Sequence, residues 1–182
     1  MIEKPQTSLI KVTEKAKKLK LLILDVDGVL TDGKLFFDNQ GNEYKSFHAR
    51  DGHGIKLLRQ TGVEVAVISG RKSNSVALRM KNLGVEHVYQ GHENKQAAFN
   101  EIIEKMGIMP EQAAHVGDDL LDLPIMTRVG FAIAVSDANF AVKQRADWCT
   151  TLSGGHGAVR EVCDFIMQAQ GRFDEVLNAY LK

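Results

Sequence analysis

The stretch LLILDVDGVL, residues 21–30, decides the fold. It begins with an apolar run that leads directly into Asp25, Asp27 and Gly28. A short strand that is apolar on both faces has to be covered on both sides, which is typical of a parallel sheet. Open sheets of this kind bind their ligands at the carboxyl ends of the strands. The two aspartates therefore lie where a functional site is expected.

Outward from this strand, short β-rich runs alternate with helical patterns along the rest of the chain. This alternation predicts an α/β fold, with a doubly wound, mostly parallel sheet and helices on both faces. Without a repeat or linker, we expect one domain over residues 20–171, after a basic lead-in (1–19) and before a C-terminal tail (172–182). The predicted strands cover residues 21–26, 63–68, 87–89, 113–116, 131–135 and 148–150, and the predicted helices cover residues 54–60, 73–83, 95–106, 120–128, 139–145 and 158–170.

One segment, residues 34–47, interrupts the alternation. Two aromatic-rich runs flank the sequence NQGN (39–42), which predicts a β-hairpin. A two-stranded hairpin is only marginally stable by itself, so its large side chains need a cover. These side chains could be covered either by the domain's own core or by a contact between subunits. The side chains concerned are Leu35, Phe36, Phe37, Tyr44 and Phe47.

The composition argues against several classes of protein. The 182 residues are 44% hydrophobic and 25% charged, with 23 basic and 23 acidic side chains, which is ordinary for a folded domain. A net charge of zero argues against a dedicated nucleic-acid binder. We expect no secretory signal and no membrane segment, because no apolar run reaches ~18 residues. Cys149 and Cys163 form no CxxC pair and predict free thiols, so we expect a cytoplasmic protein.

The first 20 residues differ from the rest of the chain in charge. They contain six Lys and two Glu, whereas the remainder is mildly acidic. We interpret them as a solvated lead-in, with a short basic helix for an anionic surface as the alternative.

Polar residues follow several of the predicted strands. Asp25 and Asp27 follow the first, Ser69-Gly70-Arg71 the second and Gly117-Asp118-Asp119 the fourth, while Lys95 opens the helix after the third. Each has an ordinary structural explanation by itself, as a strand end, a turn, a surface lysine or a helix cap. Together they would bring four carboxylates, a hydroxyl and an ammonium to one edge of the sheet.

This set of residue types suits phosphoryl transfer. Carboxylates held close together repel each other and need a cation, and all-oxygen ligands favour Mg²⁺. Asp25 could attack a phosphate as a nucleophile, and Asp27 could protonate the leaving oxygen. Ser69 could donate to a phosphoryl oxygen, and Lys95 could neutralise the charge that develops on the transferring group.

Four motifs carry a resemblance to a known family. DVDGVLTDG (25–33), ISGR (68–71), Lys95 and GDDLLDLP (117–124) resemble the motifs of haloacid-dehalogenase-type phosphohydrolases. The resemblance implies that Asp25 is the nucleophile and a Mg²⁺ ligand, and that Asp27 is the acid/base and lends its backbone carbonyl to the metal. It also implies that Asp118 is the third protein ligand of the metal and that Ser69 and Lys95 bind the phosphoryl group. Asp119 or Asp122 would hold the metal's waters or Lys95.

Longer segments narrow the resemblance to one branch of the family. HARDGHGIKLL (48–58), LGVEHVYQGHENK (83–95) and GGHGAVREVCDFIMQAQG (154–171) are similar to phosphatases of an eight-carbon sugar acid in lipopolysaccharide precursor synthesis. Arg and Lys suit the carboxylate of such a substrate, and His and Asp suit its hydroxyls. Alternatively, Asp51 and Gly52 simply turn the chain into the next helix. The implied substrate-binding residues are Asp27, His48, Ala49, Arg50, Asp51, Gly52, Lys56, Arg71, Arg79 and Lys95.

The spacing between the motifs leaves no room for a cap domain. Residues 33–63 hold only the hairpin and one helix, and residues 95–117 hold one helix and a strand. A site without a lid is open to water. The resemblance implies a homotetramer in which the hairpins associate and neighbouring chains cover the site. It also brings the Gly-rich tail at 154–157 toward a neighbour's site, where many relatives have Arg in place of His156.

Three alternatives stand beside this interpretation. A nine-carbon sugar acid could be the substrate on the same scaffold. A phospho-receiver uses similar residues, but here no Asp follows the strand at 87–89 and the acidic pair comes late, so the order contradicts it. A catalytically idle oligomeric scaffold is favoured by the hairpin, but not by the presence of both Asp25 and Asp27.

Overall fold

The computed structural model describes residues 9–92 and 94–182, so the first eight residues of the predicted lead-in lie outside it. Its main sheet has six parallel strands in the order β5-β4-β1-β6-β7-β8. β1 lies inside the sheet, and the chain builds first one side of it and then the other. The predicted parallel α/β architecture is confirmed. The strands are β1 (Leu21–Leu24), β4 (Glu64–Ser69), β5 (His87–Gln90), β6 (Ala113–Gly117), β7 (Phe131–Ala134) and β8 (Trp148–Cys149).

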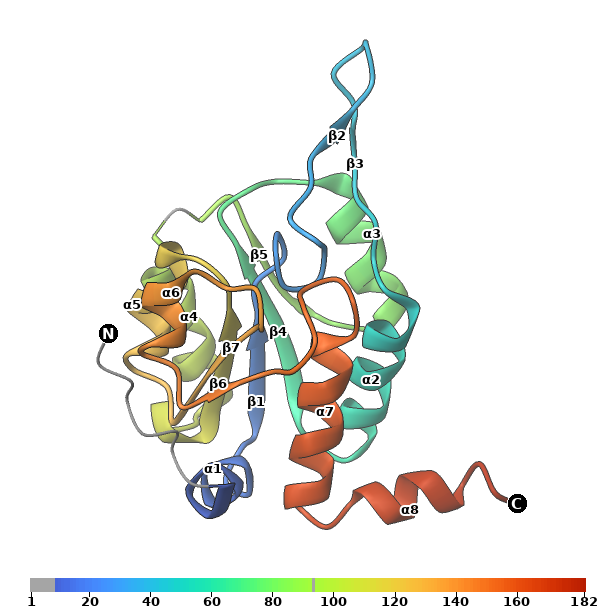
Figure 1. Ribbon diagram of the computed structural model, residues 1–182, viewed down its shortest axis with the longest axis vertical. Coiled ribbons are helices and arrows are strands. Elements are labelled where there is room, and N and C mark those ends of the chain that lie inside the picture. The colour runs from blue at the N-terminus through green and yellow to red at the C-terminus, as the bar shows by residue number, and fades with distance from the viewer. Residues whose placement is uncertain (1–8, 93) are drawn as a thin grey trace.

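Helices cover both faces of this sheet (Figure 1). α2 (Ala49–Gln60), α3 (Asn74–Leu83) and α7 (Ala158–Ala169) lie on one side, and α4 (Lys95–Met106), α5 (Leu123–Met126) and α6 (Phe140–Lys143) on the other. The side chains of β1 alternate between two cores. Leu22 and Leu24 belong to the core under α2 and α7, whereas Leu21 and Ile23 belong to the core under α4 and α5. This double burial is why β1 is a continuous apolar run.

Three predicted helices differ from those observed, and one of them, predicted at 139–145, is only the four-residue α6. α2 begins at Ala49, five residues before the predicted start. Its first turns contain two glycines, which are tolerated there because neighbouring side chains pack against them. A Cβ at Gly52 would lie 2.1 Å from Arg79 Nη2, and one at Gly54 would lie 2.8 Å from Arg160 Cδ. The predicted helix at 120–128 is instead a 3-10 turn, Leu120–Asp122, followed by the short α5.

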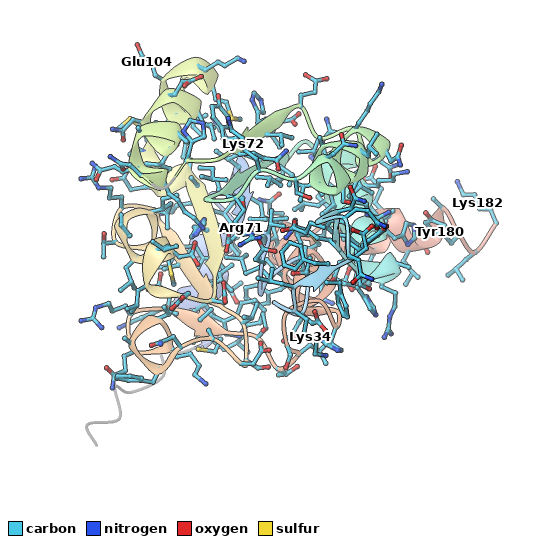
Figure 2. The ribbon with its side chains drawn as sticks, turned by 90° about the horizontal axis from the view of Figure 1, so that it is seen from above. Lys34, Arg71, Lys72, Glu104, Tyr180 and Lys182 are labelled. Atoms are coloured by element: carbon cyan, nitrogen blue, oxygen red, sulfur yellow. The ribbon has the colours of Figure 1, made fainter. Side chains whose placement is uncertain are left out.

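Both ends of the described chain are folded onto the domain or next to it. α1 (Leu9–Ala16) forms within the basic segment, and Gln170 Nε2 donates to the carbonyl of Ala16 over 3.1 Å. α8 (Phe173–Asn178) lies in the predicted tail, and Tyr180 beyond it is hydrogen-bonded to His53 over 3.0 Å. In Figure 2, seen from above, Tyr180 lies at the edge of the molecule and Arg71 over its middle. The division of the chain at residues 19 and 171 stays a prediction.

The predicted hairpin is present and projects from the body (Figure 1). Its strands, β2 (Phe36–Phe37) and β3 (Glu43–Tyr44), are shorter than predicted. Asp38 holds the turn, because its Oδ1 accepts hydrogen bonds from the backbone N–H groups of Gln40 and Asn42, each 2.9 Å long. Of the large side chains, Phe47 packs on the domain core, whereas those nearer the tip remain about half exposed in this single chain.

Candidate active site

The loop after β1 brings Asp25 and Asp27 to the carboxyl edge of the sheet. The loop is wound tightly, since the N–H groups of Leu30 and Thr31 both donate to the carbonyl of Val26. Gly28 adopts a φ of +98°, and a Cβ there would lie 2.2 Å from Asp118 Oδ2. Glycine is therefore required for both the turn and the approach of Asp118.

Carboxylates converge here from two strands. Asp25 follows β1, Asp118 follows β6 and Asp122 closes the 3-10 turn, and each contributes an oxygen to a group within 4.8 Å. Burial, then the charge of Asp122, raises the pKa of Asp25 to about 6. Burial, then the charge of Asp25, raises the pKa of Asp118 to about 8. Such repulsion is relieved by a bound cation.

The donor set fits Mg²⁺, whose preferred ligands are oxygens. Asp118 Oδ1 is buried and has no hydrogen-bond partner among the described residues. Both carboxylate oxygens of Asp122, in contrast, already have polar partners. Its Oδ2 accepts from the N–H groups of Asp118 (2.9 Å) and Asp119 (3.2 Å), and its Oδ1 contacts Lys95 Nζ (2.7 Å) and His115 Nε2 (3.0 Å). Asp25 and Asp118 are therefore the side chains with oxygens available to a metal.

Lys95 enters the site as the first residue of α4. Its Nζ lies 2.7 Å from Asp25 Oδ1 and 2.7 Å from Asp122 Oδ1. Burial opposes its charge, but the two carboxylates outweigh burial and raise the pKa of Lys95. The structure thus places Asp122 at Lys95. Asp119 instead caps the 3-10 turn, where its Oδ1 accepts from the N–H of Leu120.

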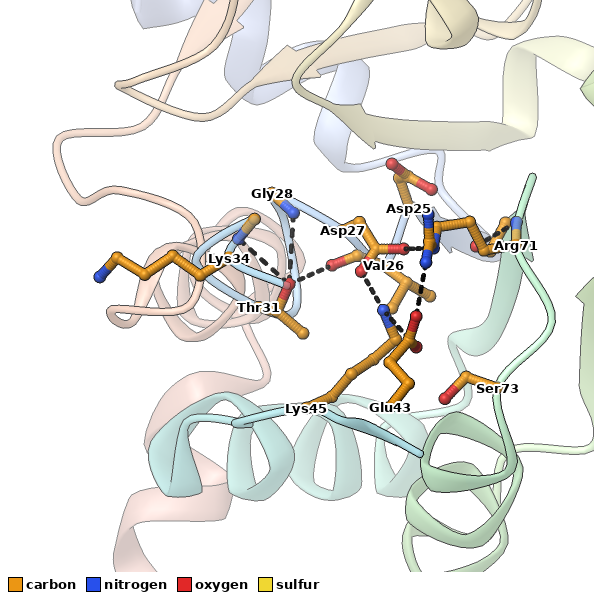
Figure 3. A network of polar contacts seen from close by, with 12 residues as sticks. Asp25, Val26, Asp27, Gly28, Thr31, Lys34, Glu43, Lys45, Arg71 and Ser73 are labelled. Carbon is orange, nitrogen blue, oxygen red and sulfur yellow. Dashed lines mark hydrogen bonds and ion pairs between the residues drawn. The ribbon is translucent and has the colours of Figure 1, made fainter. Parts of the chain in front are cut away.

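Ser69 and Arg71 follow β4 at the same edge of the sheet. Ser69 is buried, and its Oγ accepts a hydrogen bond of 3.3 Å from the N–H of Arg71. Arg71 extends over the loop after β1, with its Nε 3.9 Å from Asp27 Oδ2. Figure 3 shows this guanidinium beside Asp25 and Asp27.

Two residues of the hairpin stem reach the site and were missed from the sequence. Lys45 Nζ forms an ion pair with Asp27 Oδ1 and lies 3.1 Å from Glu43 Oε1 (Figure 3). Glu43 Oε2 in turn lies 2.6 Å from Arg71 Nη2. Only 2% of the Lys45 side chain is exposed. The sequence did contain a signal for these two residues. Side chains alternate along a strand, so residues 43 and 45 share one face and Tyr44 lies on the other.

The segment implied to bind a sugar acid starts α2, and its members differ in their surroundings. Ala49 and Arg50 are exposed. His48 Nδ1 lies 3.9 Å from Asp51 Oδ2. Arg79 Nη2 is 3.5 Å from the carbonyl of His48, and the same guanidinium lies against Gly52.

Two predicted substrate contacts have other surroundings in this chain. Asp51 is buried, and its Oδ1 accepts a 2.8 Å hydrogen bond from the N–H of Arg160 in the first turn of α7. Burial raises its pKa. One oxygen of the carboxylate therefore joins α2 to α7, and a substrate contact of Asp51 stays a prediction. Lys56 lines a groove with Arg59 and Lys81 near the C-terminal ends of α2 and α3, away from the carboxyl edge of the sheet.

The Gly-rich tail packs on its own chain. The N–H of Gly155 donates to the carbonyl of Val29 over 2.9 Å. A Cβ at Gly154 would lie 1.6 Å from the carbonyl oxygen of Gly28, so only glycine fits. His156 Nδ1 is 2.8 Å from the carbonyl of Gly154. The backbone of the tail thus supports the loop that carries Asp27.

A doubly wound sheet with an Asp-x-Asp loop after β1, a buried lysine at α4 and a second acidic loop after β6 defines a class of hydrolase. The family model of haloacid dehalogenase-like hydrolases matches residues 85–162. The chain belongs to the haloacid dehalogenase-like hydrolases, in the branch of the 3-deoxy-D-manno-octulosonate 8-phosphate phosphatases.

Curated and solved relatives support this assignment. The chain is 51% identical over 164 residues to 3-deoxy-D-manno-octulosonate 8-phosphate phosphatase KdsC of Escherichia coli (strain K12), which covers 90% of this chain and 87% of that protein. The phosphatase structure from Yersinia pestis has a TM-score of 0.89 at 43% identity, covering 90% and 89% of the two chains. That from Moraxella catarrhalis, solved with magnesium, phosphate and KDO, has a TM-score of 0.93 at 39% identity, covering 95% and 99%.

No helix within residues 9–92 and 94–182 is both long and apolar enough to cross a membrane.

Proposed function

We propose that this protein is a Mg²⁺-dependent phosphatase that hydrolyses 3-deoxy-D-manno-octulosonate 8-phosphate to the free sugar acid and phosphate, in lipopolysaccharide precursor synthesis. The observation that carries the reaction class is the cluster of the buried Asp25 and Lys95 with the half-buried Asp118, beside Asp27. The 51% identity to the Escherichia coli phosphatase supports the substrate.

In the first step, Asp25 attacks the phosphorus atom. Its Oδ1 is held by Lys95, which leaves Oδ2 for the new P–O bond. The ester P–O bond breaks, and Asp27 gives its proton to the leaving oxygen. Lys95 and Ser69 contact the phosphoryl oxygens and stabilise the charge that spreads over them.

In the second step, water releases the phosphate. Asp27, now a carboxylate, takes a proton from the water as it attacks the aspartyl-phosphate, and the acyl-phosphate bond to Asp25 breaks. Asp25, Asp118 and the backbone carbonyl of Asp27 would hold Mg²⁺, whose positive charge would offset the repulsion between carboxylates and phosphate. Asp122 keeps Lys95 in place throughout.

Arg71 and the start of α2 provide the chemistry for a sugar acid. Arg71 lies over Asp27, on the side where the leaving group departs, and a guanidinium suits a carboxylate. His48, Arg50 and Arg79 lie around the start of α2, where they can donate to hydroxyls and to the carboxylate. Lys45 and Glu43 add a cation and an acceptor next to Asp27.

The protein acts in the cytoplasm as a homotetramer, with residues 20–171 as its phosphatase domain. The free thiols Cys149 and Cys163 suit a reducing compartment. The half-exposed Phe36 and Phe37 at the hairpin support association, and neighbouring chains would then close the open site. Neither nucleic acid nor membrane is required as a partner.

The experiment is phosphate release with Mg²⁺ from a substrate panel. The panel contains 3-deoxy-D-manno-octulosonate 8-phosphate, 2-keto-3-deoxynononate 9-phosphate, hexose phosphates and an aryl phosphate. Preference for the eight-carbon ester supports the proposal. Preference for the nine-carbon ester keeps the chemistry but replaces the substrate. No release from any ester by folded protein favours an idle scaffold.

A further inference from the structure

His115 is a buried histidine that the mechanism above leaves without a task. It lies on β6 between β1 and β7, with 0% of its surface exposed. A polar ring in such a position costs free energy unless it is hydrogen-bonded. Its contacts therefore indicate what it does there.

The contact that His115 makes is to the acidic partner of Lys95. Its Nε2 lies 3.0 Å from Asp122 Oδ1, the oxygen that is also 2.7 Å from Lys95 Nζ. Its Nδ1 is buried without a hydrogen-bond partner in the described part of the chain. The Asp122 carboxylate can only accept, so the histidine donates through an Nε2–H group.

This donor completes a carboxylate held from every side. Backbone N–H groups of Asp118 and Asp119 hold Oδ2 of Asp122, and His115 and Lys95 hold Oδ1. With both oxygens fixed, the carboxylate cannot rotate without losing hydrogen bonds. Lys95 in turn is shared evenly, 2.7 Å from Asp122 and 2.7 Å from Asp25.

We propose that His115 is a positioning residue for phosphoryl transfer. By donating to Asp122 it fixes the carboxylate that holds Lys95 between Asp122 and the nucleophile Asp25. Without this donor, Oδ1 of Asp122 is left with Lys95, and its attraction for the ammonium becomes stronger. The lysine is then drawn toward Asp122, away from Asp25 and from the phosphoryl oxygens. The inference rests on the proposed function.

A matched pair of variants tests it. His115→Gln keeps an N–H donor that can reach Asp122, whereas His115→Met has a similar length and no donor. We expect the Gln variant to keep kcat within about threefold of the wild type, and the Met variant to lose about tenfold, the effect of one hydrogen bond to a charged group. Both should unfold at similar temperatures. If the Met variant does not fold, His115→Asn, which is too short to reach, takes its place.

A double-mutant cycle shows whether the histidine acts through Asp122. In an Asp122→Asn background the difference between the Gln and Met variants should become much smaller, because the amide oxygen is an uncharged and weaker acceptor. A structural role in the core would leave that difference unchanged. Additive effects in the two backgrounds would therefore overturn the inference, as would equal kcat values for Gln and Met in the native background.

Binding of inorganic phosphate separates this inference from the proposed function. Calorimetry with Mg²⁺ present measures the affinity for phosphate, to which Lys95 contributes, without turnover. We expect the Gln variant to bind phosphate as the wild type does, and the Met variant to bind about tenfold more weakly. A wild type that hydrolyses no ester refutes the proposed function alone, whereas equal phosphate affinities of the two variants refute the positioning role.

Discussion

The carboxyl edge of the main sheet and the tip of the hairpin depart from ordinary burial in opposite directions. At the edge, charged side chains are buried, with Asp25 8%, Lys95 2% and Asp122 0% exposed. At the hairpin, apolar side chains are open, with Phe36 49% and Phe37 56% exposed. Burying charge and exposing aromatic rings are both unfavourable unless something compensates.

The two regions differ in where that compensation is found. Lys95 lies between Asp25 and Asp122, so most of the charge at the edge is balanced by the chain itself. The outer face of the hairpin has no comparable cover within the described residues. The charge at the edge is thus compensated within one chain, whereas the exposed rings of the hairpin fit the proposed contact with a neighbouring subunit.

The largest expected effect is at the nucleophile. Asp25→Asn removes the attacking oxygen, so kcat should fall by roughly 10³-fold or more. Phosphate release with Mg²⁺ measures it. Asp32→Asn, at a carboxylate a few residues further along that pairs with Lys34 and is 22% exposed, is the matched control and should keep its activity. Turnover near the wild-type rate in Asp25→Asn would remove the nucleophile assignment.

A second prediction sharpens the boundary between the two regions. Lys45 belongs to the hairpin by sequence but to the active site by contact, through Asp27 and Glu43. Lys45→Met should lower kcat/KM by about 10–100-fold, because it removes a buried charged partner of Asp27. Lys34→Met changes the same charge on an exposed lysine of the hairpin and should have little effect. Equal losses in both variants would contradict a specific role of Lys45.

A third prediction concerns the charge balance among the carboxylates. The pKa of Asp118 is raised to about 8, so protonation favours the folded state, and the metal-free protein loses stability as the pH rises from about 4 toward 8. Mg²⁺ replaces the proton. The rise in Tm on adding Mg²⁺ should therefore be several degrees larger at pH 8 than at pH 5.

Thermal unfolding with EDTA and with Mg²⁺ measures this difference. Asp118→Asn is the control and should remove most of the Mg²⁺ effect. The same Mg²⁺-induced shift at both pH values would contradict a metal site at Asp118.

The smallest effect on the single chain is expected at the hairpin. Phe36→Ser with Phe37→Ser replaces exposed rings, so the unfolding free energy of the isolated subunit should change by less than about 0.5 kcal/mol per site. The assembly, in contrast, should dissociate. Light scattering measures the mass. A wild type that is a monomer at all concentrations would refute the shared-site tetramer.

The elements around the site could be predicted because their signals are local. α4 has the predicted bounds, Lys95–Met106, since Asn94 caps it and the left-handed Gly107 ends it. The position of Asp25 after β1 followed from one apolar run. Such features depend on neighbours in the sequence, which pattern reasoning reads directly.

The missed features depend on contacts between distant segments. Asp51 Oδ1 accepts a hydrogen bond from the N–H of Arg160, 109 residues later, a contact that no local pattern reveals. Lys45 reaches Asp27 across 18 residues because the hairpin stem folds back over the loop. The predicted helix began only at Gly54, whereas Gly52 and Gly54 both lie inside α2 and let it pack closely against Arg79 and Arg160.

The most direct test of the central claim is the identity of the phosphorylated residue. Wild-type protein turning over an ester with Mg²⁺ is quenched in acid and analysed by peptide mass spectrometry. The account predicts one added phosphoryl group on Asp25, absent from Asp25→Asn. A phosphoryl group on another residue, or none while turnover proceeds, would contradict it.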